Sequence, residues 1–140
     1  MQQPTIDDAR VLIGLAQLGA GDRELLSWIW SETFIPEYQQ FVEAYPPTSP
    51  EYAKARWIVA HYETIAVVWK HRLINEDLLF DWLWVPGIWD QIGGFVYGMR
   101  ETFGEPTLGE NLEAMATAYA NYSARTRTNS PDTPGHSKPA

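Results

Sequence analysis

Two histidines are the first residues to test for chemistry, because histidine supplies metal ligands and general bases. A di-iron or di-manganese site in a helical bundle needs Glu-x-x-His motifs on two helices. Neither His61 nor His71 has an acidic residue three positions before it. His61 lies in an apolar stripe and His71 at the end of a predicted helix, so structural roles are favoured for both. We therefore assign no metal ligand and keep His61 only as a candidate ligand-binding residue.

Asp81 is unusual because it interrupts the apolar run LLFDWLW. A carboxylate there must reach the surface or find a donor such as an arginine or a tryptophan N–H. One hypothesis is therefore an interhelix ion pair or a solvent-facing position. The other makes Asp81 the polar group of a ligand pocket lined by Phe80, Trp82, Trp84 and Trp89.

Gly94 and Gly98 form a small-x-x-x-small pattern next to Tyr97. This spacing lets two helices approach closely. One interpretation is close packing inside a single bundle. The other is a homodimer interface formed by Gly94, Tyr97 and Gly98, with aromatic side chains as its main contacts.

Familiar motifs of catalysis and cofactor binding are absent from the sequence. The Gly19-Ala20-Gly21 segment lacks the later glycine of a dinucleotide fingerprint and the lysine of a P-loop, and there is no Gly-x-Ser-x-Gly elbow. Because the chain has no cysteine, disulfides, thiolate metal sites and cysteine nucleophiles are excluded. We assign no catalytic residue, metal or cofactor, and a non-enzymatic protein is favoured over an enzyme.

The segment from residue 49 to 73 organises the helices that would carry these residues. Ser49 suits the N-cap, Pro50 the first helical position, and Glu51 the positive end of the helix dipole. Apolar residues then fall into two stripes at helical spacing, leaving a narrow mixed stripe for water. The mixed stripe consists of Arg56, Ala60, Glu63, Val67 and Lys70. A helix this apolar needs neighbours on at least two sides, so we predict the central helix of a bundle.

Capping residues and prolines delimit the helices before the central one. Thr5 and Asp8 resemble a capping box that opens the first helix. Asp22 is expected to cap a second helix, whose aromatic stripe runs up to the Pro-Pro pair before the central helix. Pro36 interrupts this stripe, so we expect a break or kink near Ile35.

Three further helices are predicted after the central one. Asn75 is expected to cap the first, after a turn short enough to fold it back against the central helix. Residues 85–87 are expected to break that helix, residues 88–104 to form the next, and residues 108–124 the last. Residues 125–140 are rich in Pro, Ser and Thr without aliphatic residues, so a disordered tail is expected. The prediction is an all-α, single-domain bundle of five to seven helices over residues 1–124.

Composition narrows the class of protein. The formal net charge of −8 disfavours nucleic-acid binding, because an acidic surface repels phosphates. No run of about 18 apolar residues occurs, and the N-terminus lacks the basic and apolar regions of a signal peptide. We therefore expect a soluble, cytoplasmic protein without a membrane span. Seven tryptophans, seven tyrosines and five phenylalanines supply more aromatic area than usual for a core or an interface.

Two stretches resemble a family of small bacterial helical proteins known only as a domain of unknown function. They are YETIAVVWKHRLINEDLLFDWL (residues 62–83) and RETFGEPTLGENLE (residues 100–113), and the similarity covers roughly residues 50–120. The resemblance implies a long helix, a short turn, an acid-capped helix and a tryptophan-containing helix, and no catalytic residue. Members often have an N-terminal membrane anchor, a feature that is not expected here.

Together these features favour a non-enzymatic helical interaction module. It would act through an aromatic-rich face, on a protein partner or by self-association as a homodimer. The alternative is a small-molecule or lipid-like ligand-binding protein, or an enzyme without recognised motifs, with its pocket near residues 80–89.

Overall fold

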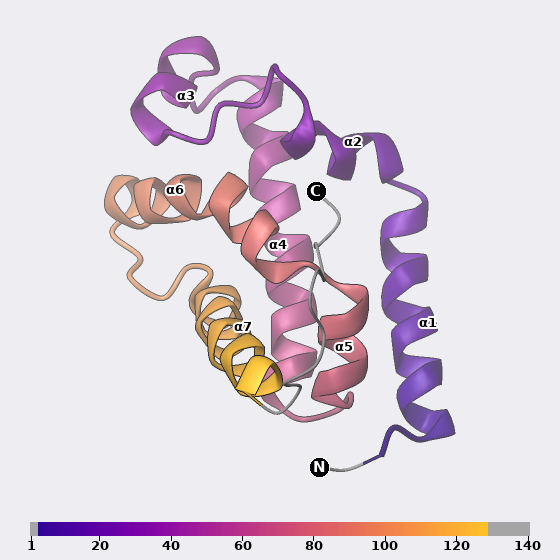
Figure 1. Cartoon of the computed structure of the whole chain (residues 1–140). Coiled ribbons are helices and arrows are strands. Elements are labelled where there is room, and N and C mark those ends of the chain that lie inside the picture. The colour runs from indigo at the N-terminus through magenta and orange to yellow at the C-terminus, as the bar shows by residue number, and fades with distance from the viewer. Residues whose placement is uncertain (1–2, 129–140) are drawn as a thin grey trace.

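The computed structural model describes residues 3–128, which form seven α-helices, one short 3-10 helix and no strand (Figure 1). The helices before the centre of the chain are α1 (Ile6–Ala20), α2 (Arg23–Ser27), η1 (Trp28–Trp30) and α3 (Tyr38–Ala44). The remaining helices are α4 (Pro50–Lys70), α5 (Glu76–Trp82), α6 (Val85–Phe103) and α7 (Glu110–Thr128). The all-α bundle predicted from the sequence is confirmed.

Helix α4 is the central element, as its apolar stripes predict. The Ser49 side chain accepts a hydrogen bond from the Tyr52 amide at 3.2 Å, and Pro50 occupies the first turn. Helix α4 packs against α7, α6 and α2. It runs through the middle of the molecule, with α1 and α5 on one side and α7 on the other, while α6 crosses in front of it (Figure 1). The fully buried residues Ile58 and Ile65 lie on its inner surface, so burial on several sides holds it in place.

Part of the aromatic surplus fills the core. The Phe95 ring on α6 lies 4.9 Å, centroid to centroid, from both Phe41 on α3 and Tyr52 on α4. The Tyr52 hydroxyl is 2.8 Å from the Tyr38 hydroxyl, so this buried phenol keeps a hydrogen-bond partner. Burial, with the Tyr38 contact, raises the pKa of Tyr52. This aromatic cluster therefore joins α3, α4 and α6.

The helix expected after Asp22 is much shorter than its aromatic stripe predicts. The chain forms only the short α2 and η1, then runs without helix from Ser31 to Glu37 before α3 begins. The Asp22 side chain makes no capping bond, whereas the Glu37 side chain accepts bonds from the Gln39 and Gln40 amides. Of the break or kink expected near Ile35, the structure has a break, and it extends over the whole loop of residues 31–37.

Two other helix ends also differ from the prediction. Residues 85–87 were expected to break a helix, but Val85 begins α6 and Pro86 lies in its first turn. Proline is tolerated there because the N–H that it lacks would have no partner within the helix. Helix α7 continues to Thr128, so it includes the first four residues of the expected tail, which was to start at Arg125. The rest of the predicted tail lies outside the described residues. Among residues 3–128, no helix combines the length and apolarity that crossing a bilayer requires.

Candidate functional site

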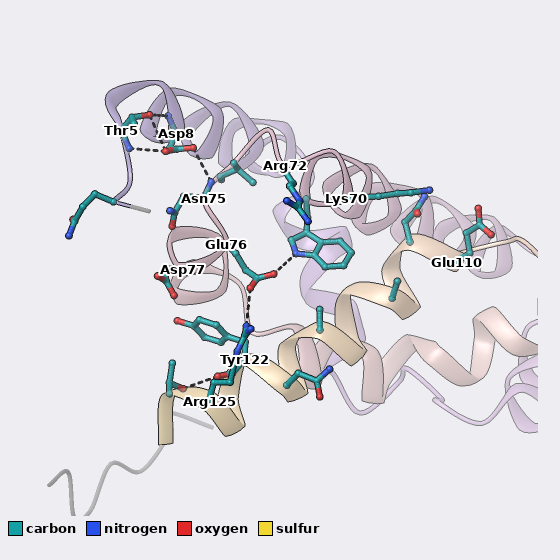
Figure 2. A pocket seen from close by; sticks show the side chains of 18 residues that line it. Thr5, Asp8, Lys70, Arg72, Asn75, Glu76, Asp77, Glu110, Tyr122 and Arg125 are labelled. Carbon is teal, nitrogen blue, oxygen red and sulfur yellow. Dashed lines mark hydrogen bonds and ion pairs between the residues drawn. The ribbon is translucent and has the colours of Figure 1, made fainter. Parts of the chain in front are cut away.

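A groove of about 1290 Å³ with charged lining residues, here called the polar groove, opens on the described part of the chain. It lies where the end of α4 and the start of α5 face α7 and the first turn of α1 (Figure 2). Its charged lining residues are Asp8, Lys70, Arg72, Glu76, Asp77, Glu110 and Arg125. Both charge signs are present, so the groove combines charged groups with apolar surface.

One end of the groove is tied together by Asp8 and the cap of α5. The Asp8 carboxylate accepts hydrogen bonds from the Thr5 amide at 2.7 Å and from the Asn75 amide at 2.9 Å. The hydrogen bond from the Thr5 amide is the main reason that the pKa of Asp8 is lowered. The Asn75 side chain in turn accepts from the Leu78 amide at 3.0 Å. Asp8 thus caps its own helix and also fastens the turn between α4 and α5.

The middle of the groove is spanned by Glu76. Its Oε2 accepts a hydrogen bond from the Trp69 indole N–H at 3.0 Å, and its Oε1 lies 3.4 Å from the Arg125 guanidinium (Figure 2). Next to it, burial raises the pKa of Tyr122 to about 12, with a contribution from its hydrogen bond to Asp77. Glu76 and Asp77 of α5 are therefore connected to side chains of α4 and α7.

The turn between α4 and α5 contains an unusual backbone conformation. Arg72 has φ of 56°, the left-handed region, and it is the one described residue other than glycine with a positive φ. The Arg72 amide donates to the Trp69 carbonyl at 3.0 Å and the Leu73 amide to the Val68 carbonyl at 3.1 Å. This is the Schellman arrangement, in which glycine is the usual residue at the left-handed position.

Three exposed tryptophans form a second feature, here called the tryptophan face and defined as Trp30, Trp82 and Trp84. Trp30 and Trp84 stack with ring centroids 6.0 Å apart and an interplanar angle of 12°. They are 50% and 41% exposed, and Trp82 is 39% exposed. Leu83, between Trp82 and Trp84, is buried in an extended conformation, whereas both neighbouring tryptophans are exposed.

The structure does not gather the predicted pocket residues around one cavity. Asp81 is exposed on α5, whereas Phe80 is buried against Tyr119 at 4.9 Å. Trp89 is half-buried and packs with its edge against Tyr97 at 5.7 Å. None of Asp81, Trp82, Trp84 and Trp89 lines the polar groove.

His61 lies apart from these tryptophans, on the side of α4 that faces α1. Its ring stacks on Trp57 with centroids 5.5 Å apart, and its imidazole lies against Gly19 of α1. Burial lowers the pKa of His61, partly offset by the charge of Asp22. It is half-buried at the boundary of the core, and it too lies outside the groove.

Gly94 and Gly98 are in close contact with the chain's own loop and helix. A Cβ on Gly94 would lie 2.6 Å from the Pro36 carbonyl oxygen, and a Cβ on Gly98 would overlap the Tyr38 ring. These glycines therefore let residues before and within α3 approach α6. Tyr97 is 48% exposed, and its hydroxyl is hydrogen-bonded to Glu113 of α7 rather than to a residue of α3.

Tyr97 belongs to a small polar cluster between α6 and α7. Its hydroxyl donates a hydrogen bond to Glu113, which also pairs with Arg100 at 3.0 Å. The Arg100 guanidinium lies 5.2 Å from the centre of the Tyr97 ring. The hydrogen bond with Tyr97 is the main cause that lowers the pKa of Glu113, and it raises the pKa of Tyr97.

Glu63 has a role that the sequence analysis missed. It was placed in the water-facing stripe of the central helix, but its Oε1 accepts from the Leu112 amide at 2.8 Å. Its Oε2 accepts from the Asn111 side chain, also at 2.8 Å. Glu63 therefore caps the start of α7 from another helix. No local motif marks such a cap, because its partners are nearly 50 residues away in the chain.

The described residues contain no group of three or more histidine, cysteine or acidic side chains placed to hold a metal ion. The arrangement instead offers a polar groove at the N-terminal end of α5 and the tryptophan face at its C-terminal end. Chemically, the first suits a small polar ligand and the second suits an apolar or cationic group of a partner.

This architecture defines a small all-α protein with a seven-helix fold over residues 3–128. The chain belongs to the family described as Domain of unknown function (DUF4760), whose model matches residues 4–119. The match confirms the family resemblance of residues 50–120 and extends it through the N-terminal helices. No curated protein and no solved structure gave a match.

Proposed function

We propose that this protein is a non-enzymatic interaction module that binds a basic segment of a protein partner through the tryptophan face. The observation that carries the proposal is the stacked pair of Trp30 and Trp84, which remains about half exposed beside a well-filled core. Tryptophan is the residue type most enriched among side chains that dominate binding energy at protein interfaces. Exposed, stacked indoles offer a partner such contacts at low entropic cost.

The exposed area of the tryptophan face indicates what kind of interface it can form. With exposed fractions of 50%, 39% and 41%, the three indoles present on the order of 300 Å². A stable protein interface buries about 800 Å² on each partner. The tryptophan face would therefore form the central contact of an interface whose rim comes from surrounding residues, or a complete site for a short peptide.

Charge favours a basic partner over a second copy of this chain. The charged neighbours of the tryptophans in sequence, Asp81 and Glu32, are both acidic and exposed, and the whole chain has a net charge of −8. Arginine and lysine bind to the faces of tryptophan rings and are attracted by nearby carboxylates. Two copies meeting at this face would instead bring like charges together, which opposes the homodimer considered from the sequence.

Calorimetric titration with a basic amphipathic peptide tests this proposal, with an acidic peptide of the same apolar pattern as the comparison. Binding of the basic peptide should be saturable and should weaken about tenfold or more in Trp84→Ala. Trp57→Ala is the matched control, because Trp57 is also exposed, at 38%, but stacks on His61 outside the face. Equal affinity for both peptides, or unchanged affinity in Trp84→Ala, would contradict the proposal. Light scattering at high protein concentration tests whether two copies of this chain associate instead.

A second candidate function is small-molecule binding, and the groove is the observation that favours it. The sequence placed such a pocket near residues 80–89, whereas the groove lies at the opposite end of α5. Its charged lining residues favour a polar metabolite over a lipid-like molecule as the ligand.

A further inference from the structure

Lys70 and Arg72 are cationic lining residues of the groove whose side chains have no hydrogen bond or ion pair within residues 3–128. The carboxylates of Asp8 and Glu76 are already engaged inside the protein. Arg125 also has a partner, because it pairs with Glu76. Among the charged side chains of the lining, Lys70, Arg72 and Glu110 therefore have no hydrogen bond or ion pair within residues 3–128, and two of these three are cationic donors.

The other two acids of the groove are also negatively charged, and each lies in the first turn of its own helix. Asp77 is connected to Tyr122 by a hydrogen bond that contributes to the raised pKa of the phenol. Glu110 lies in the first turn of α7, where the helix dipole favours a negative charge. In Figure 2, Glu110 lies beyond Lys70, far from the Asp8 end of the groove. Both acids thus have structural reasons for their positions.

Backbone geometry gives a second, independent reason to single out Arg72. At the left-handed position of a Schellman turn a glycine would be unstrained, whereas an arginine costs stability. Such outliers occur preferentially at ligand sites, where the side chain has a use. Here the strained residue places a guanidinium on the wall of the groove, beside the first turn of α5 (Figure 2).

The volume of the groove sets the scale of the occupant. At about 1290 Å³ it exceeds the usual range of about 300–1,000 Å³ for small-molecule pockets. Asparagine side chains, including Asn121, add neutral donors and acceptors to the lining. A single inorganic ion would leave most of this space to water, so a molecule of metabolite size fits better.

We propose that the groove is a binding site for a small organic anion, whose carboxylate or phosphate group is held by Arg72 and Lys70. Arginine provides a planar pair of donors that matches either group, and lysine adds a point charge. The polar lining would contact the remainder of the molecule. This site is separate from the tryptophan face, so it stands or falls independently of the proposed partner binding.

Nuclear magnetic resonance titration of the full chain tests the site, with citrate and inorganic phosphate as separate probes and sodium chloride at matched ionic strength. The Trp69 indole N–H is a built-in reporter, because it donates to Glu76 in the wall of the groove. Its signal and the Arg72 amide should shift saturably with citrate or phosphate and not with chloride. Comparing the two probes distinguishes carboxylate from phosphate recognition.

Arg72→Gly separates loss of binding from loss of folding. Glycine suits the left-handed position, so the variant should melt at the same or a higher temperature while its probe affinity falls about tenfold or more. Lys70→Ala should weaken binding in the same direction. Lys54→Ala, an exposed lysine of α4 outside the groove, should change neither property. Shifts that chloride reproduces, absence of a saturable shift with both probes, or unchanged affinity in Arg72→Gly would overturn the proposal.

Discussion

Glu63 on α4 holds the Leu112 amide of α7 at 2.8 Å, so one carboxylate joins two helices that pack side by side. Helix α7 has four free amides at its start, as every helix does. Here the acceptor comes from another helix rather than from the preceding residues, which makes the start of α7 dependent on the central helix.

Replacing Glu63 with alanine should therefore lower the free energy of unfolding by about 1–2 kcal/mol, the usual cost of losing a helix cap. Chemical denaturation measures the loss. Glu101→Ala is the control, because Glu101 is exposed on α6 and should change stability by less than about 0.5 kcal/mol. Equal stabilities for the two variants would show that the interhelix cap contributes nothing.

Gly98→Ala should destabilise the fold by about 1–3 kcal/mol, because the new methyl group would overlap the Tyr38 ring and force it to move. Gly14→Ala provides the matched comparison within a helix. No atom lies within 4 Å of the position of its Cβ, and alanine is the better helix former by about 0.5–1 kcal/mol. Thermal melts should move in opposite directions, and a stabilising Gly98→Ala would contradict the packing described for α3 and α6.

His61 should make stability depend on pH above the range in which carboxylates titrate. Burial lowers its pKa in the folded state below the ordinary value of 6.5, so the unfolded chain takes up the proton first. The contribution of neutral His61 to the free energy of unfolding is therefore complete above pH 6.5. It decreases as the pH falls through 6.5 and stops decreasing below the pKa of His61 in the folded state. Denaturation curves across this range should show the decrease in the native protein.

Two histidine variants isolate this effect. His61→Gln stays neutral and should remove most of the decrease, whereas His71→Gln, at the exposed end of α4, should leave it in place. A decrease that survives in His61→Gln would assign the pH dependence to other groups.

Asp8 and Asp7 form a natural pair for testing how α1 is attached. Asp8 binds Thr5 and Asn75, while the Asp7 side chain is 89% exposed and pairs only with Arg10 on the same helix. Asp8→Ala should increase hydrogen exchange of the α1 amides, since α1 contacts the bundle mainly through α2 and α5. Asp7→Ala should leave exchange unchanged, and equal rates in both variants would exclude Asp8 as the attachment.

Helix starts and stops that depend on neighbouring residues were predicted correctly. Ser49 caps α4, Asn75 caps α5, and Gly104 ends α6 in the left-handed conformation with φ of 64°. Each is decided by bonds between residues three or four positions apart. The same local logic was wrong at Asp22, because the residues after it pack as short turns around the aromatic cluster rather than as one helix.

The candidate sites, in contrast to the helix ends, depend mainly on tertiary packing rather than on local sequence. The tryptophans and Asp81 were recognised from their types, but whether each is buried or exposed depends on helices distant in sequence. Glu63 looked like a water-facing residue, and Arg72 carried no signal at all. Both owe their roles to the way α4 meets α5 and α7.

By itself, the sequence of this protein determined the all-α class, the central helix and most helix ends, because periodicity and capping act within a few residues. Only the tertiary structure decided that Gly98 makes room for Tyr38, that Trp30 stacks on Trp84, and that a polar groove opens beside α5. These features join residues far apart in the chain. Their geometry is set by how complete helices pack, which no local pattern encodes.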